Sequence, residues 1–323
     1  MKKYMKMMLS VVFCAGLMQS PLQASPFKDF CRKWVPRAVT VGYWGVLSAP
    51  GLYAMHSHIN GDQEKIWRDI NGSDKNNRPF FYELKEYAPE KYAEMNALHR
   101  EAGLPGLDDC SIKVITEDGS MRLASVSDLA GTFVENYYDQ ACCMGKNRIL
   151  IGEPLINETI KIEHKNGVYV ETVVIKPPVI ESTAAVLAHE KEHSDKNHRN
   201  KRVVLISTVP FMLHASFKGI ASIIPISTSG SLLRIPQAGA ILYGTVILGR
   251  WYSRKCEREA DASVKNSPKL ALKAAEYFQA LEQRPYGFVE CLEATHPHPS
   301  ERAAYLQKWA AEAKAKKKQE ANK

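Results

Sequence analysis

The sequence predicts an α+β fold that is mainly helical, with a small sheet. Several segments repeat apolar residues at helical spacing, whereas the strand signals are short and few. The clearest strand signal is the alternation over 160–174, which turns at Asn166-Gly167, a pair typical of a two-residue hairpin. With 323 residues, 45% of them hydrophobic and 24% charged, the chain suits one or two folded domains. This composition excludes a disordered tail protein, a collagen and a coiled coil.

The first 24 residues have the layout of a secretory signal peptide. A basic start precedes an apolar run over 7–18 and a polar stretch that ends at Ala24. The run is shorter than the about 20 residues that a spanning helix needs, although an uncleaved anchor is the alternative. We therefore expect an exported protein, periplasmic or associated with the exported side of a membrane.

Export bears on the cysteines, because disulfides form in oxidising compartments. The chain has 7 cysteines, of which Cys14 lies in the predicted signal peptide. The others are Cys31, Cys110, Cys142, Cys143, Cys256 and Cys291. Six cysteines allow 15 pairings, and the sequence does not choose among them. No CxxC pair occurs, so a structural zinc cluster of thiolates is not expected.

The formal net charge of +8 does not by itself identify a partner. Much of the basic excess lies at the two ends of the chain, within 1–24 and within a C-terminal tail over 306–323. Between these ends the charge is nearly balanced. We therefore expect no nucleic-acid partner.

The predicted elements before residue 181 are short. The segment 89–102 predicts a helix, with Pro89 in its first turn and Gly103 after its end. The segment 112–126 predicts two strands around an Asp-Gly turn, and 148–151 predicts a short apolar strand.

Helical spacing dominates the second half of the chain. We expect helices over 181–198, 270–281 and 299–318, the last of them fraying into the basic tail. Together with the earlier elements, this predicts an N-terminal helical region over 25–107, one main domain over 108–305 and the basic tail over 306–323.

The segment 203–249 is unusually apolar. It holds only two charged residues, Lys218 and Arg234, and a Ser/Thr/Gly-rich turn divides it into two arms. One interpretation is a helical hairpin that inserts into a membrane or lies at its surface. The other, slightly favoured, is a pair of buried core helices, because prolines interrupt both arms and the second arm is short for a span.

The HEKEH segment at 189–193 predicts a metal site. Residues four apart on a helix face the same way, so His189 and His193 can bind one metal ion. Glu190 then faces a water molecule whose pKa zinc lowers toward about 7, and its carboxylate can take the proton. The alternative is a solvated, charged helix face on which the histidines are incidental.

A catalytic zinc needs a third protein ligand, and the CEREAD segment at 256–261 offers two carboxylates. Glu257 and Asp261 are four residues apart and share a helix face. One can bind the metal while the other accepts a hydrogen bond from a ligating imidazole. Glu259 is expected to be solvated, and His164, His198 and His214 to be bystanders.

These motifs resemble a family of zinc metalloproteases that includes the CAAX prenyl endoprotease, the heat-shock membrane protease HtpX and exported envelope quality-control proteases. HExxH on one helix and ExxAD on a later helix mark this family, and HEKEH and EREAD match both in order. The resemblance implies a zincin-like metalloprotease domain over 108–305 with one zinc ion. By resemblance, His189, His193 and Glu257 are the ligands, Glu190 is the general base, and Asp261 is the partner of a ligand.

Two further expectations come from the same resemblance. The segment 295–302 is similar to a THP…R element of the exported members, so His296 is expected as a fourth ligand or as a hydrogen-bond donor to the oxyanion. His298 is the competing candidate, and a helix cap is the alternative role of this element. The family's substrate-binding edge strand is expected at Arg148, Ile149, Leu150 and Ile151, where a peptide would add as a strand.

The resemblance implies an exported zinc endopeptidase that hydrolyses misfolded or membrane-associated envelope proteins. The expected partner is a protein or peptide substrate, with membrane association through 203–249 left open. One alternative is a membrane-embedded processing protease. Another is a non-catalytic, zinc-bound protein that binds clients; Glu190 argues against it, because a structural site does not need a base. The oligomeric state and the cleavage preference do not follow from the sequence.

Overall fold

The structure is a computed structural model that describes residues 40–45, 48, 52, 62–126, 140–165, 168–223, 234–281 and 296–322. The contacts divide the chain into two compact units. One unit takes in 57–202 and 250–323, and we name it the larger unit. The other takes in 1–56 and 203–249. The predicted signal peptide over 1–24 lies outside the described residues.

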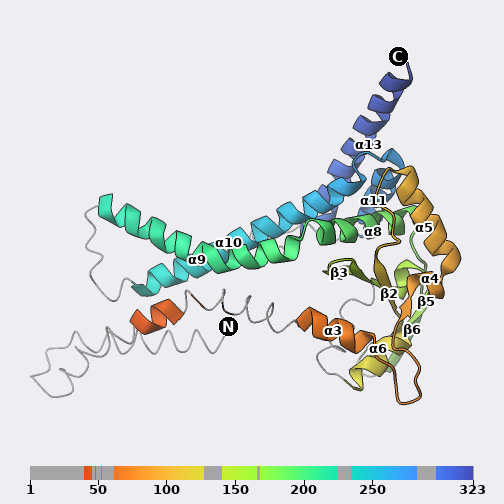
Figure 1. The fold of residues 1–323 in the computed structure, drawn as a ribbon, viewed down its shortest axis with the longest axis horizontal. Helices are drawn as coiled ribbons and strands as arrows, with labels where there is room; N and C mark the ends of the chain where they lie inside the picture. The colour runs from red at the N-terminus through yellow and green to blue at the C-terminus, as the bar shows by residue number, and fades with distance from the viewer. Residues whose placement is uncertain are drawn as a thin grey trace, which may run out of the picture. The chain divides into compact units, whose positions relative to one another are not determined.

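Helices predominate in the structure, as predicted (Figure 1). The first half of the chain contains α3 (Asp62–Ile70), β1 (Tyr82–Glu83), α4 (Leu84–Tyr87), α5 (Pro89–Glu101), β2 (Ser111–Ile115), α6 (Glu117–Ala124), β3 (Ala141–Gly145), β4 (Arg148–Gly152) and the 3-10 turn η2 (Glu153–Leu155). The second half contains β5 (Thr159–Lys165), β6 (Val168–Ile175), α8 (Ile180–Asp195), α9 (His198–Ile223), α10 (Arg234–Asp261), the 3-10 turn η4 (Ala262–Val264), α11 (Pro268–Ala280) and α13 (Pro299–Ala321). The fold class is therefore α+β and mainly α.

The main sheet has four strands in the order β1-β2-β4-β3. Strand β2 runs parallel to β4, with Ile112 opposite Ile149. Strand β3 runs antiparallel to β4, with Cys142 opposite Leu150. In the part of the chain that the structure describes, β3 and β1 are therefore the edge strands, and β4 lies between two neighbours.

The expectation that Arg148, Ile149, Leu150 and Ile151 form the edge strand is wrong. These residues form β4, whose three apolar side chains are fully buried. Ile149 and Ile151 pack into the core on one face of the sheet, and Leu150 packs into the core on the other face. A strand that is covered on both faces and paired on both sides is apolar throughout. The apolar run that predicted a strand here is therefore typical of a strand inside the sheet, not of one at its edge.

The larger core lies between the sheet and the helices α5, α8, α11 and α13. Leu187 of α8 and Leu98 of α5 are buried there with Leu270 of α11 and Leu306 of α13. Helices α11 and α13 pack side by side (Figure 1). Both begin with a capped proline turn: the Ser267 side chain accepts from Leu270 N at 3.4 Å, and Pro268 follows it. This packing fixes α8, which carries the HEKEH segment, against the sheet.

The segment 112–126 forms one strand and one helix, where two strands were predicted. Helix α6 begins after Thr116, whose hydroxyl accepts from Gly119 N at 3.0 Å. Gly119 is needed because a Cβ there would lie 2.1 Å from the Phe80 carbonyl oxygen. The Asp-Gly pair therefore marks a close approach between two backbone segments inside a helix. The hairpin over 160–174, in contrast, is confirmed as β5 and β6.

Two predicted boundaries do not match the structure. The boundary at 107 falls inside the larger unit, because β1 pairs with β2 across it, with Tyr82 opposite Val114. The helix over 299–318 does not end in a separate tail at 306, because α13 continues to Ala321 and buries Leu306 and Ala310. Its last residues, which carry the basic group, are helical and exposed.

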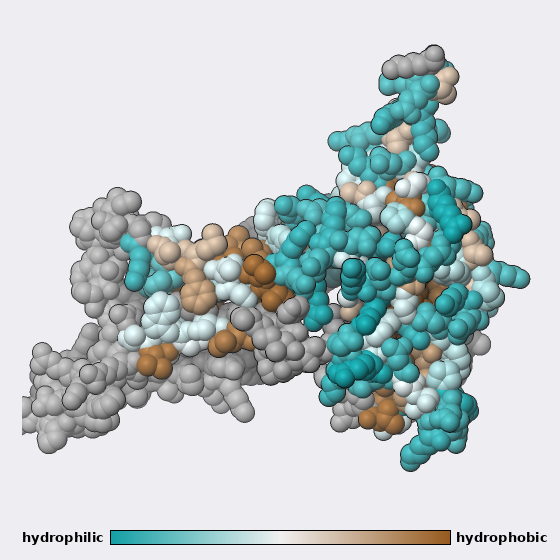
Figure 2. Space-filling model, viewed as in Figure 1, coloured by the Kyte–Doolittle hydropathy of each residue, from teal (hydrophilic) through white to brown (hydrophobic). Residues whose placement is uncertain are grey.

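The segment 203–249 contributes most of α9 and α10 and belongs to the second unit. A small apolar cluster forms there from Tyr43, Ala238 and Ile241, with Leu213 against it. Many other large apolar side chains of the two helices are exposed, among them Val204, Phe211, Met212, Tyr243, Val246 and Trp251. Figure 2 shows apolar side chains along this part of the chain. The described side chains of this segment are thus partly buried, as the slightly favoured expectation of core helices requires, and partly exposed.

No helix within the described ranges has both the length and the apolar character that crossing a bilayer requires. The cysteines that the structure describes are unpaired: Cys110, Cys142, Cys143 and Cys256 all carry free thiols.

Candidate metal centre

Helix α8 carries three polar side chains of the site. His189 and His193 lie one turn apart on the same face, and their Nε2 atoms are 3.0 Å apart. The Glu190 carboxylate lies beside them, with Oε1 3.9 Å from His189 Nε2. All three side chains are largely buried, and they line a cleft of about 1140 Å³ that β3 also borders.

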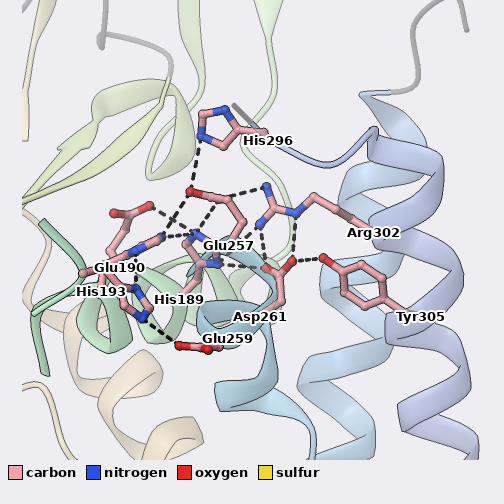
Figure 3. A network of polar contacts seen from close by, with 10 residues as sticks. His189, Glu190, His193, Glu257, Glu259, Asp261, His296, Arg302 and Tyr305 are labelled. Carbon is pink, nitrogen blue, oxygen red and sulfur yellow. Dashed lines mark hydrogen bonds and ion pairs between the residues drawn. The ribbon is translucent and has the colours of Figure 1, made fainter. Parts of the chain in front are cut away.

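The third predicted ligand comes from the last turns of α10. Glu257 places Oε2 3.3 Å from His189 Nε2 and Oε1 3.4 Å from His193 Nε2. The structure thus brings together one ligand atom from each of His189, His193 and Glu257, all within 4.8 Å of one another. Figure 3 shows these side chains converging on Glu257.

Asp261 lies one turn beyond Glu257 and contacts the outer side of His189. Its Oδ1 is 2.8 Å from His189 Nδ1, which is the contact expected of a ligand's partner. Arg302 of α13 donates to both oxygens of this carboxylate, and the Tyr305 hydroxyl donates to Oδ2 (Figure 3). From the sequence, Arg302 was expected only as part of the 295–302 motif, and the contact of Tyr305 with Asp261 was not predicted. Their spacing of three residues on one helix could have indicated both.

His193 has a partner that the sequence did not indicate. Nδ1 of His198 is 2.8 Å from His193 Nδ1, and Nε2 of His198 is 3.2 Å from Glu259 Oε2. The expectation that His198 is a bystander is therefore wrong, whereas Glu259 is exposed to solvent as expected and also contacts His198. Helix α8 ends at Asp195, and Asn197 adopts a φ of 52° before α9 begins at His198. This left-handed residue, which Asn tolerates, brings His198 back to His193.

The two histidines of the segment 295–302 have different contacts. His296 Nε2 is 3.5 Å from Glu257 Oε1, and its side chain is 60% exposed at the edge of the cleft. His298 instead caps α13, because its Nδ1 accepts from Ser300 N at 3.3 Å. The structure thus brings His296, and not His298, near the predicted ligands.

The electrostatics of the site favour positive charge between the ligands. Burial alone would lower the pKa of His189, but the Asp261 and Glu257 carboxylates raise it to about 10. Burial alone would raise the pKa of Glu257, and contacts with the two imidazoles hold it well below its usual range. Asp261 follows the same pattern: despite burial, Arg302 and His189 lower its pKa to about 2.

Glu190 behaves differently from these two carboxylates. Burial raises its pKa, and the two nearby imidazoles only partly oppose the shift. A raised pKa brings a carboxylate closer to the range in which it both takes and returns a proton at neutral pH. Glu190 therefore suits a general base, whereas Glu257 suits a permanently charged ligand.

The donor set fits a catalytic zinc ion. Two imidazole nitrogens and one carboxylate form a known ligand set for catalytic zinc. Bonds of about 2.0–2.2 Å at tetrahedral angles hold ligand atoms roughly 3.3 Å apart. The separations of 3.0, 3.3 and 3.4 Å between Nε2 of His189, Nε2 of His193 and the Glu257 oxygens agree with that spacing.

Comparison with known families gives one match. Residues 154–310 match the model of peptidase family M48, and this segment contains α8, the end of α10 and the first half of α13. Comparisons with curated proteins and with solved structures gave no match. The match over residues 154–310, just under half of the chain, is to a family of metallopeptidases.

Proposed function

We propose that this protein is a zinc-dependent endopeptidase in which His189, His193 and Glu257 bind the metal and Glu190 is the general base. The observation that carries the proposal is the convergence of three ligand atoms within 4.8 Å at the wall of a cleft. The M48 match over 154–310 supports the same reaction class. Zinc supplies Lewis acidity, which lowers the pKa of water toward about 7 and polarises a carbonyl.

Glu190 performs the proton transfers in this proposal. Its carboxylate takes a proton from water as the water attacks the peptide carbonyl, and it returns a proton to the leaving nitrogen. The Cys143 backbone also acts to lower the pKa of this carboxylate, so the base lies beside strand β3. Asp261 holds the His189 ring through Nδ1, so that Nε2 stays available to the metal.

Strand β3 offers the substrate a place to bind. The carbonyl of Gln140 accepts from Gly152 N of β4 at 2.7 Å, so Gln140 faces into the sheet. Alternate residues of an edge strand direct their backbone groups outward, and Ala141 and Cys143 therefore face away from β4. Both residues line the cleft with Glu190. An extended peptide that adds to β3 would thus pass beside the general base.

We also propose that the enzyme is exported and acts on misfolded or membrane-associated envelope proteins. The signal-peptide layout of 1–24 supports export. The exposed apolar side chains of α9 and α10 support a second candidate, a processing protease that works at a membrane surface. Both candidates use the same peptide-bond hydrolysis.

Two substitutions test the reaction. Glu190→Gln keeps the metal site, so it should retain zinc while casein digestion falls on the order of 10²- to 10⁴-fold. Glu257→Gln should lose zinc strongly, because it removes a ligand charge. Glu276→Gln is the matched control, since Glu276 is a partly exposed carboxylate of α11 that pairs with Lys273. Digestion by Glu190→Gln at the wild-type rate would exclude Glu190 as the base, and equal zinc content in the two other variants would exclude Glu257 as a ligand.

A further inference from the structure

The two ligand histidines have different outer partners. His189 has the Asp261 carboxylate at its Nδ1, at 2.8 Å. His193 has instead a second imidazole, that of His198, at 2.8 Å between the two Nδ1 atoms. The His198 ring is 4% exposed, and its other nitrogen lies 3.2 Å from Glu259 Oε2. Figure 3 labels His193 and Glu259, the two ends of this chain of contacts.

The contacts define one arrangement of protons when His193 is a ligand. A histidine that binds a metal through Nε2 carries its proton on Nδ1, and a partner fixes that tautomer. The Nδ1–H of His193 then donates to Nδ1 of His198, which must be the unprotonated nitrogen of that ring. The proton of His198 is therefore on Nε2, where the Glu259 carboxylate accepts it. Each contact has one donor and one acceptor.

We propose that His198 is a positioning residue that fixes the tautomer and the ring orientation of His193, and that Glu259 fixes His198 in turn. This inference rests on the proposed zinc site. The polypeptide supplies the three members from separate elements: α8 carries His193, α9 begins at His198, and α10 carries Glu259. The site therefore has an outer partner for each imidazole, a carboxylate for one and an imidazole–carboxylate pair for the other.

A purely structural role for His198 is the competing explanation. The hydrogen bond to Glu259 joins the first turn of α9 to α10, and in this explanation it only stabilises the fold. That role would change the unfolding of the metal-free protein and leave its zinc affinity unaltered. A positioning role changes the zinc affinity itself, because a freed His193 ring must be ordered again when it binds.

The test measures zinc affinity by competition with a chromophoric chelator, on the full chain, together with thermal unfolding of the metal-free protein. His198→Leu removes both contacts and should weaken zinc binding by about 10- to 100-fold. His198→Gln keeps an acceptor for His193 and a donor for Glu259, so it should recover much of that affinity. The Co²⁺-substituted protein adds a spectroscopic readout: the visible bands should shift in His198→Leu and return toward wild type in His198→Gln.

Glu259→Gln and Lys255→Ala complete the design. Glu259→Gln weakens the outer contact and should give an intermediate loss of affinity. Lys255→Ala is the matched control, because Lys255 approaches the same carboxylate at 3.8 Å from a largely exposed position and does not touch His198. Wild-type zinc affinity in both His198→Leu and Glu259→Gln would overturn the positioning role alone. Absence of zinc binding in the wild-type protein would instead overturn the proposed function, and this inference with it.

Discussion

Arg302 donates to both carboxylate oxygens of Asp261, through Nε to Oδ2 at 2.9 Å and through Nη2 to Oδ1 at 2.6 Å. Asp261 Oδ1 also contacts His189 Nδ1, so a residue of α13 orients a predicted ligand of α8 through a residue of α10. The guanidinium lies 3.8 Å above the Phe278 ring, which further fixes its plane. Such bidentate geometry is specific to arginine.

The first prediction concerns this pair. Arg302→Lys keeps the positive charge but loses the bidentate contact, so zinc affinity should fall by about 10- to 100-fold, as for other outer partners of a ligand. The buried pair should also lose stability, on the order of 1–3 kcal/mol. Arg258→Lys is the control, since Arg258 of α10 pairs with Glu301 of α13 at an exposed position. That change should cost about 1 kcal/mol or less. Equal zinc affinity in the two variants would contradict a role for Arg302 in the site.

The second prediction concerns strand addition at β3. Ala141→Pro removes an outward N–H while leaving the pairing with β4, which edge strands tolerate. Losing one hydrogen bond of about 0.5–1.5 kcal/mol should raise KM for a peptide roughly 2- to 12-fold with little change in kcat. Ala141→Val enlarges the same side chain and keeps the N–H, so it separates the two effects. An unchanged KM in the proline variant would argue against peptide binding at this strand.

The spacing of four residues explains how much of the site the sequence could predict. His189 and His193 share a helix face, as do Glu257 and Asp261, and helical periodicity alone gives both pairs. The edge strand could not be predicted in the same way, because the order of strands in a sheet depends on contacts between distant segments. A short apolar strand predicts burial, and burial says nothing of which neighbour lies on either side.

His198 was missed for a different reason. It lies five residues after His193, and on one continuous helix those two side chains would not face each other. The left-handed Asn197 interrupts the helix and reverses that expectation. The helix over 181–198 was predicted from apolar spacing over 184–188 followed by a charged end, and charged residues alone do not mark where one helix stops and the next begins. The positive φ of Asn197 is therefore the reason why His198 contacts His193 in the structure although the sequence did not predict it.

The third prediction concerns pH and the contact between α5 and α8. His99 is fully buried, and its Nε2 is 2.8 Å from the Ala184 carbonyl oxygen. Burial lowers its pKa, so the unfolded chain binds a proton near the ordinary value of about 6.5 while the folded chain does not. Stability is then complete above that value and falls as the pH drops toward the folded pKa. The slope from this one residue is at most about 1.4 kcal/mol per pH unit.

Urea unfolding of the metal-free protein at several pH values checks this. His99→Gln does not titrate, so its free energy of unfolding should decline less steeply than that of the wild type below about pH 6.5. The histidines of the metal site are common to both proteins and cancel in the difference. Parallel pH profiles for the two proteins would show that His99 does not contribute.

The last prediction concerns His296. Its Nε2 contacts Glu257 Oε1 at 3.5 Å but does not join the three ligand atoms that lie within 4.8 Å of one another. That position suits a hydrogen-bond donor to the developing oxyanion, so His296→Ala should lower kcat on the order of 10²-fold and leave zinc content unchanged. His298→Ala is the control, because it removes the cap of α13, at about 1 kcal/mol of stability. Faster proteolysis by His296→Ala would instead show that this imidazole blocks the open metal position in the wild-type enzyme.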